Sequence, residues 1–132
     1  MDEEEVIRLS AALRYTGDHQ WLKQEGKLVK VGITEYARHE LGDIVFVELP
    51  DVWERVTAKT VIGSIESVKT KADLLAPISG EIVDINEKLQ DSPELVDQDP
   101  YGKGWLVMIE PSNPHELKEL LSAAAYEALI KK

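Results

Sequence analysis

Two lysines, Lys69 and Lys71, lie in a short polar segment between the apolar stretches of Ile65–Val83. This pattern predicts a hairpin whose tip displays Lys69 to solvent. An unmodified lysine there is protonated at pH 7, because its reference pKa is about 10.4, and it is therefore a poor nucleophile. Display suits another chemistry, in which an enzyme acylates the amine and leaves a neutral, flexible tether. The alternative is that Lys69 merely keeps the hairpin tip hydrated.

Other patterns that carry chemistry are incomplete in this chain. Asp97 and Asp99 begin like a calcium loop, but Tyr101 occupies a position that needs an oxygen ligand. Gly63–Ser67 resembles a nucleophile elbow without its closing glycine. The three histidines have no zinc-binding spacing, so surface or structural roles are expected for His19, His39 and His115. We therefore predict no catalytic residue and no metal ligand.

Composition narrows the function classes further. The 132 residues suit one domain, and the formal net charge of −10 argues against binding to nucleic acid or to an anionic membrane. No apolar run approaches the roughly 20 residues of a membrane-spanning helix. The acidic start MDEEEV is unlike a secretory signal or a transit peptide. The absence of cysteine excludes disulfides, thiolate metal sites and cysteine nucleophiles.

Hydrophobic periodicity predicts a mainly β chain with a helix at each end. Val6, Leu9 and Leu13 have helical spacing within residues 1–13. Residues 113–132 predict a longer helix, in which Asn113 is the N-cap and Glu116 completes a capping box. Helical turns are expected at residues 34–42 and 92–95. The predicted strands are Leu28–Ile33, Ile44–Leu49, Thr60–Ile65, Ala76–Ile85 and Trp105–Glu110.

A short internal repeat supports a two-sheet arrangement. Gly42–Val47 and Gly80–Ile85 both read glycine, acid, isoleucine, valine, any residue, aliphatic. Such strings also occur by chance in strands, and the repeat alone does not define a fold. It gains value because the second copy follows the lysine segment. It then indicates a pseudo-symmetric pair of sheets.

A series of short motifs runs through most of the chain. In sequence order they are Tyr15-Thr16 with His19 and Trp21, Val31–Thr34, Leu41–Pro50, Glu66–Lys69, Ala76–Glu81, Pro93–Val96, Asp99–Gly102 and Gly104-Trp105. Together they resemble the H-protein of the glycine cleavage system, from about Arg14 into the C-terminal helix. The resemblance implies a mainly β fold, a flattened β-sandwich or barrel-sandwich hybrid of the lipoyl-domain type with peripheral helices, including one at the C-terminus. The whole chain would then be one lipoyl-carrier domain, with an N-terminal segment 1–13, a β core 14–112 and a C-terminal helix 113–132.

The resemblance also implies a function and a site. Lys69 would carry lipoic acid through an amide bond, with Glu66, Ser67, Val68 and Asp73 as the recognition flank. The lipoyl arm would visit three enzymes: a pyridoxal-phosphate glycine decarboxylase, a tetrahydrofolate-dependent aminomethyltransferase and dihydrolipoyl dehydrogenase. A further enzyme would attach the lipoate. The chain itself would be a non-catalytic carrier, in the cytoplasm of a bacterium or in the mitochondrial matrix if it is a processed eukaryotic chain.

This sequence departs from the family's usual pattern at a few positions. Gln20 replaces an acidic residue near the place where a loaded arm is thought to rest, and Trp53 replaces a small residue. We expect Trp53 to cover a sheet edge. Lys71 adds a second amine, which could pair with Glu66 or Asp73 or be a minor acylation site.

Two other carrier functions also depend on a modified lysine. A relay protein that donates lipoate to other complexes needs the same lysine, so sequence alone does not separate it from glycine cleavage. A biotin carrier is disfavoured, because Val68 and Thr70 stand where methionines usually flank the lysine.

Overall fold

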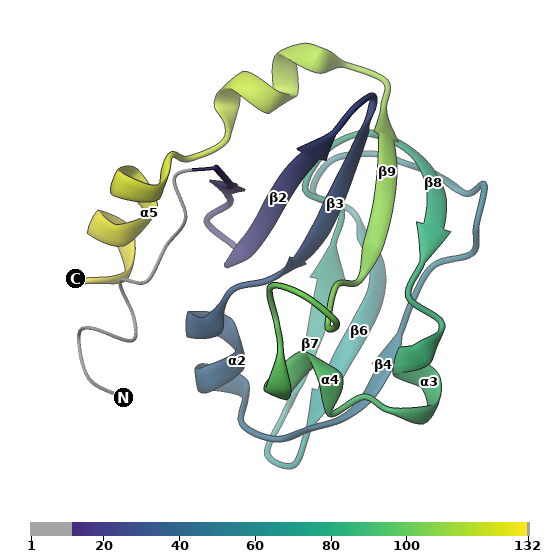
Figure 1. The fold of residues 1–132 in the computed structure, drawn as a ribbon, viewed down its shortest axis with the longest axis vertical. Coiled ribbons are helices and arrows are strands. Elements are labelled where there is room, and N and C mark those ends of the chain that lie inside the picture. Colours follow the sequence, from purple (N-terminus) through teal and green to yellow (C-terminus); the bar gives the residue numbers. More distant parts are fainter. Residues whose placement is uncertain (1–11, 132) are drawn as a thin grey trace.

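The computed structural model describes residues 12–131, which form two antiparallel β-sheets packed face to face (Figure 1). The larger sheet has the strand order β1-β2-β3-β9-β8-β5, and the smaller sheet has the order β4-β6-β7. The predicted mainly β sandwich is thus confirmed. The strands are β1 Arg14–Tyr15, β2 Gln20–Glu25, β3 Leu28–Ile33, β4 Ile44–Glu48, β5 Arg55–Val56, β6 Val61–Ser67, β7 Lys71–Leu75, β8 Gly80–Ile85 and β9 Val107–Pro111.

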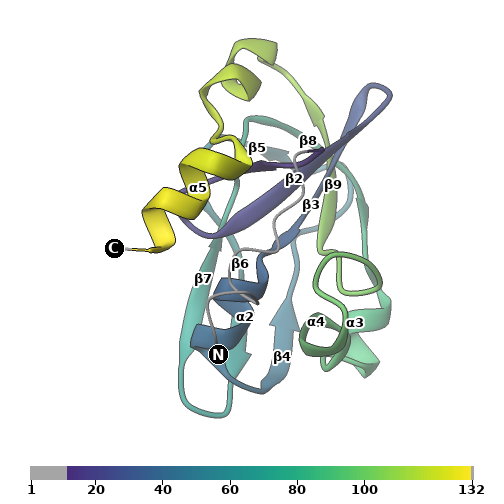
Figure 2. The same ribbon diagram turned by 60° about the vertical axis from the view of Figure 1, so that its left-hand side comes forward.

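Short helices lie at the periphery of the two sheets (Figures 1 and 2). The β6–β7 tip and the 3₁₀ helix lie at opposite ends of the molecule's long axis in both views. Within residues 12–131, no helix combines the length and apolar character needed to span a membrane. The helices are α2 Glu35–Leu41, α3 Lys88–Asp91, α4 Leu95–Gln98, the 3₁₀ helix η1 Pro114–Glu119 and α5 Ala123–Ile130.

The main hydrophobic core fills the space between the sheets. Val31 and Ile109 from the larger sheet and Ile65 from the smaller one are almost completely buried, as is Ile78 in the loop before β8. Strand side chains alternate between faces, so one face of each sheet supplies this core. Burial of each such side chain stabilises the fold by about 1.5–3 kcal/mol. The core therefore holds β6, which leads into the lysine hairpin, against the larger sheet.

A second, aromatic cluster packs the C-terminal helix α5 against the larger sheet. It contains Leu13, Tyr15, Trp21 and Tyr126, all buried. The rings of Tyr15 and Tyr126 stack with centroids 4.9 Å apart. The indole of Trp21 donates a hydrogen bond to the carbonyl oxygen of Pro100 at 2.9 Å. Trp21 is thus a packing residue, and the cluster anchors the end of the chain.

The C-terminal segment differs from the single helix predicted for residues 113–132. Asn113 does cap the first part, since its side chain accepts a hydrogen bond from the His115 backbone, but that part is the 3₁₀ helix η1. Glu116 is not the second half of a capping box, because its carboxylate binds Ser79 instead. Leu121 then forms an isolated β-bridge with Tyr15, and α5 starts afresh with Ser122 as its cap. Tertiary pairing thus overrides a continuous helical pattern.

Other predicted elements shift by a few residues or have a different environment. The strand that returns from the lysine segment is β7, not the Ala76–Ile85 segment, whose second half is β8 in the other sheet. The predicted strand Ile44–Leu49 forms as β4, but Val45 and Phe46 are about half exposed. Of the predicted N-terminal helix, Val6 and Leu9 lie outside the described residues.

The internal repeat corresponds to matched local structure. Its first copy contains β4 in the smaller sheet and its second contains β8 in the larger sheet. Both strands show a register shift at the same repeat position, between Ile44 and Phe46 and between Ile82 and Asp84. Each shift is a β-bulge, which inserts one extra residue into a strand. Each copy of the repeat therefore contains the same backbone feature, a bulge at its fourth residue.

Candidate functional site

Lys69 lies at the tip of the β6–β7 hairpin and is exposed. The two strands pair as far as Glu66 opposite Lys71, so the turn is Ser67–Thr70. The Ser67 backbone N–H donates to the Thr70 carbonyl at 2.7 Å and closes the turn. No ion pair involves Lys69 in the described part of the chain. Its amine is thus held out from the sheet without a competing carboxylate.

The hydroxyl of Ser67 organises the turn from inside. Ser67 is buried, and its Oγ accepts hydrogen bonds from the backbone N–H groups of Lys69 at 3.3 Å and Thr70 at 3.1 Å. Serine favours such local bonds to nearby backbone groups in turns. One side chain therefore fixes both peptide groups that flank the Lys69 Cα.

The segment between α2 and β4 supports the turn from below. The Val68 backbone N–H donates to the carbonyl oxygen of Asp43 at 3.0 Å. The stem of Lys69 lies over Gly42, where an added Cβ would be 3.4 Å from the lysine Cε. Gly42 has φ 84° and ψ −161°, a backbone conformation essentially restricted to glycine. This glycine ends α2 and also leaves space for the lysine stem.

Helix α4 holds the same segment from the other side. The Asp97 carboxylate accepts a hydrogen bond from the Ile44 backbone N–H at 2.8 Å. Burial raises the pKa of Asp97 above its ordinary value, while the bond from Ile44 acts in the opposite direction. The residues that begin β4 are therefore linked both to the lysine turn and to α4.

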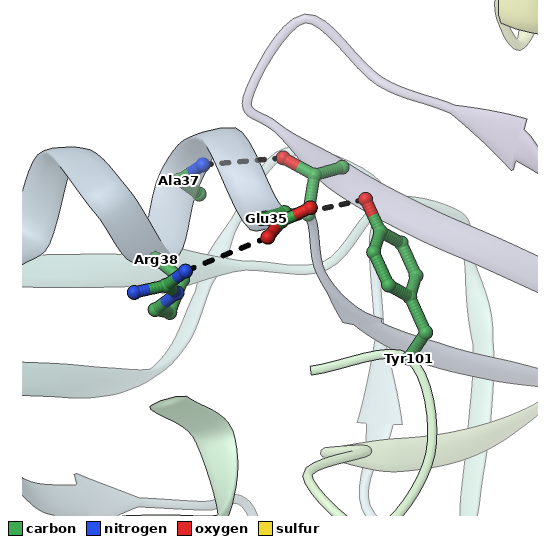
Figure 3. Close-up of polar contacts among 5 residues, drawn as sticks. Glu35, Ala37, Arg38 and Tyr101 are labelled. Carbon is green, nitrogen blue, oxygen red and sulfur yellow. Dashed lines mark hydrogen bonds and ion pairs between the residues drawn. The ribbon is translucent and has the colours of Figure 1, made fainter. Parts of the chain in front are cut away.

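Helix α2 is fixed at its start by two hydroxyl groups (Figure 3). Thr34 caps it, with Oγ1 accepting from the Ala37 N–H at 3.2 Å. The Tyr101 hydroxyl accepts from the Glu35 backbone N–H at 3.0 Å, and Arg38 pairs with Glu35 at 3.6 Å. Burial raises the pKa of Tyr101 to about 12, so it remains a neutral phenol at neutral pH. Because these contacts hold the start of α2, they also help to position Gly42, which follows the last residue of the helix next to the hairpin.

A cavity of about 380 Å³ lies beside the hairpin, between β7, α2 and the residues that enter β2. Ile65 and Ala72 from the hairpin and Leu41 from α2 supply apolar walls. Gln20 also lines it, but its side chain is already committed, since Nε2 donates to the Leu75 carbonyl at 2.7 Å and Oε1 accepts from Thr16 at 3.2 Å. Gln20 thus links β2 to β7 as a neutral side chain.

His19 lines the same cavity, and its ring is held by a hydrogen bond to another side chain. Its Nδ1 lies 2.9 Å from the hydroxyl of Tyr126, which also hydrogen-bonds Thr34 Oγ1 at 2.7 Å. Burial lowers the pKa of His19 below its ordinary value, although Asp18 and Glu40 act in the opposite direction. His39 and His115 are exposed. In residues 12–131 no cluster of His, Cys, Asp or Glu could hold a metal ion.

The structure gathers the predicted flank around Lys69, with different exposures. Ser67 is buried, whereas Val68 is 68% exposed and Glu66 lies directly across from Lys71. Asp73 is exposed further along β7, opposite Ser64. Of the two hypotheses for Lys71, the ion pair is not formed, since Lys71 has no pair with Glu66 or Asp73 in the described residues. The other hypothesis, minor acylation, stays a prediction.

The supports beneath Lys69 were not identified from the sequence. In the sequence, Gly42 is the last residue of a predicted helical turn and the first residue of the internal repeat, and Asp97 belongs to an incomplete calcium loop. Their contacts with the hairpin and with β4 cross large sequence separations that no local pattern records. Trp53 is 67% exposed with φ 75°, at the turn before the edge strand β5.

A lysine displayed on a hairpin of two packed antiparallel sheets defines a domain of the lipoyl type. The family model described as glycine cleavage H-protein matches residues 13–132. The glycine cleavage system H protein of Oceanobacillus iheyensis is 53% identical over 95% of this chain and 99% of its own length. That of Bacillus licheniformis is 51% identical over 90% of this chain and 94% of its own.

The solved structures agree with the sequence relatives. The crystal structure of a glycine cleavage system H protein from Mycobacterium marinum matches with a TM-score of 0.85 and 40% identity. The match covers 94% of this chain and all of that one. The chain belongs to the glycine cleavage H-protein family and is a carrier component of that system.

Proposed function

We propose that Lys69 carries lipoic acid in amide linkage and that the rest of the chain is a rigid support for that arm. The observation that carries this proposal is the exposed Lys69 at a turn fixed by Ser67 and by Asp43. When bound, the group supplies a cyclic disulfide that accepts an aminomethyl unit and becomes reduced, and later returns to the disulfide. The chain supplies the anchor and its orientation.

The residues present fit such a group. The amine of Lys69 is accessible and forms no ion pair with the described carboxylates, so an attaching enzyme can reach it without breaking an ion pair. The turn is hydrogen-bonded independently of the amine, so acylation removes a charge without removing a support. The recognition flank in this proposal is Glu66, Ser67, Val68 and Asp73.

The partners follow from membership of the family. We assign glycine decarboxylase, the aminomethyltransferase and dihydrolipoyl dehydrogenase as the enzymes that meet the arm, and a lipoate-attaching enzyme as the one that meets the bare lysine. The chain acts without catalytic groups of its own. Because the named relatives are bacterial, we place this function in the bacterial cytoplasm. Those relatives also favour glycine cleavage over lipoate relay.

Replacing Lys69 with arginine tests the proposal. Lys69→Arg keeps the positive charge but cannot form the amide. We expect complete loss of lipoyl incorporation and of glycine decarboxylation in a reconstituted system, with stability changed by less than about 0.5 kcal/mol. The matched control is Lys71→Arg, two residues away on β7, which is expected to retain both activities. Decarboxylation supported by Lys69→Arg would contradict the proposal.

A further inference from the structure

Three exposed apolar side chains lie on the protein surface next to Lys69. Val45 is 48% exposed, Phe46 is 50% exposed and Val68 is 68% exposed. Phe46 on β4 pairs with Glu66 on β6, and the Val68 N–H bonds the carbonyl of Asp43, two residues before Val45. We call Val45, Phe46 and Val68 the tip patch. Val68 precedes Lys69 in the sequence, and Phe46 is paired with a residue three positions before Lys69.

The phenylalanine in this patch is not required by the backbone of β4. The repeat places the same bulge in β8, where Asp84 occupies the position that corresponds to Phe46 and is exposed. A polar residue is therefore compatible with this backbone. The bulge of β4 instead leaves Val45 and Phe46 exposed between the buried Ile44 and Val47. A group of neighbouring exposed apolar side chains that the fold does not need, one of them aromatic, indicates a contact surface.

Charged residues around the tip patch indicate the chemistry of its partner. Asp43 and Glu48 are exposed at either end of the patch on the β4 segment, and Glu66 lies across from Phe46. The whole chain carries a formal net charge of −10. A partner with an apolar pocket and a basic rim would be complementary to this surface, and the opposite charges would accelerate the encounter.

We propose that the tip patch is the docking surface for the enzyme that acylates Lys69, an inference that rests on the proposed function. The new bond forms at Nζ itself, so this enzyme must cover the tip, including Val68, and by strand pairing it reaches Phe46. The enzymes of the glycine cycle react at the far end of the arm and do not need to cover the tip. The partner is therefore an acyl-transferring enzyme with a basic, apolar-centred groove.

The chemical step at this surface is an ordinary acyl transfer. The deprotonated Nζ attacks the carbonyl carbon of a lipoyl adenylate, which is the activated acid formed from lipoate and ATP. A carbon–nitrogen bond forms, the carbon–oxygen bond to AMP breaks, and the amine proton passes to solvent. No electron transfer accompanies the step. The tip patch contributes binding and does not take part in bond making.

Replacing the exposed aromatic residue tests this surface. Apo-protein carrying Phe46→Thr is incubated with a bacterial lipoate–protein ligase, lipoate and ATP, and lipoylation rates are measured by intact mass. We expect kcat/KM to fall about ten-fold, chiefly through KM, which corresponds to about 1.4 kcal/mol. Val68→Thr is expected to act in the same direction. Glu48→Lys should raise KM and weaken its dependence on salt.

The matched control is Val61→Thr. Val61 is 58% exposed on the same sheet but lies at the other end of β6, opposite Leu75. Its lipoylation rate should stay within two-fold of the parent. Unchanged lipoylation of Phe46→Thr would overturn the inference, and it would do so even if the lipoylated variant were slow with glycine decarboxylase. Absence of lipoylation in the parent protein would instead overturn the proposed function.

Discussion

In both the lysine turn and the aromatic cluster under α5, a buried hydroxyl group makes two hydrogen bonds, but the turn exposes a side chain whereas the cluster buries its side chains. In the turn, the buried Ser67 hydroxyl binds two backbone N–H groups so that Lys69 is displayed. In the cluster, the buried Tyr126 hydroxyl binds Thr34 and His19, and nothing is displayed. The residue types most often used in catalysis are here structural. The residue proposed to carry the function, Lys69, is distinguished by where the backbone places it.

The largest stability effect should come from the aromatic cluster. Tyr126→Ala removes a fully buried ring, and we expect a loss of about 3–5 kcal/mol in the free energy of unfolding. Tyr126→Phe removes only the hydroxyl and should cost about 1–3 kcal/mol, because Thr34 and His19 lose a partner. Denaturant unfolding measures both effects.

The same variants test whether the two regions are independent. Leu129→Ala is the control on the same helix, since Leu129 is 40% exposed and should change stability little. Lipoylation of folded Tyr126→Phe should match the parent. A ten-fold slower lipoylation of this variant would show that the aromatic cluster affects the lysine turn, and the two regions would then not be independent.

An intermediate effect is expected where the lysine stem contacts the main chain. Gly42→Ala places a side chain at φ 84° and beneath Lys69, and we expect a loss of about 1–3 kcal/mol. Amide hydrogen exchange at Val68 should also accelerate. Gly17→Ala is the control, because a Cβ added there would have no atom within 4 Å and its φ lies outside the left-handed region. If the two variants are equally stable, Gly42 does not contribute to holding the turn.

A smaller effect should follow from loss of the Ser67 hydroxyl. Ser67→Ala leaves the N–H groups of Lys69 and Thr70 without their acceptor and should cost about 1 kcal/mol. Exchange of these two amides should accelerate while those of β3 stay protected. Ser112→Ala, at an exposed serine, provides the control. If exchange at the tip is unchanged, Ser67 does not order the turn.

The smallest effect concerns the pH dependence of the aromatic cluster. Because burial lowers the pKa of His19 from its ordinary value of 6.5, the unfolded chain binds more protons just below that pH. Stability should therefore fall as the pH drops from 6.5 through the lowered pKa and level off below it. His19→Asn, which tolerates the φ of 66°, should flatten this part of the profile, whereas His39→Asn should not. If the dependence of stability on pH is unchanged in His19→Asn, a group other than His19 causes it.

Local patterns in the sequence predicted the helix and strands that position Lys69, but not the tertiary contacts that hold them in place. The strand Leu28–Ile33, the helix that ends at Gly42 and the hairpin around Lys69 have apolar periods and stop signals that depend on neighbours in the chain. The continuous helix predicted at 113–132 was wrong because Leu121 pairs with Tyr15, a contact between distant segments. Ser122, which caps α5, was a local signal for the break.

The candidate site follows the same division. Lys69 could be proposed from the polar break in its segment together with the family motifs, because each of these signals is a short run of neighbouring residues. Asp97 could not, since its bond to Ile44 depends on how α4 packs after folding. Nor could the exposure of Phe46, because apolar letters in a strand predict burial and the bulge that turns Phe46 outward is set by pairing with β6.

The most direct test is peptide mapping by mass spectrometry of the protein isolated from cells with a working lipoate-attachment system. The account predicts one lipoyl group per chain, located on Lys69, with Lys71 unmodified. A protein from those cells with a bare Lys69, or with the group on Lys71 alone, would contradict it.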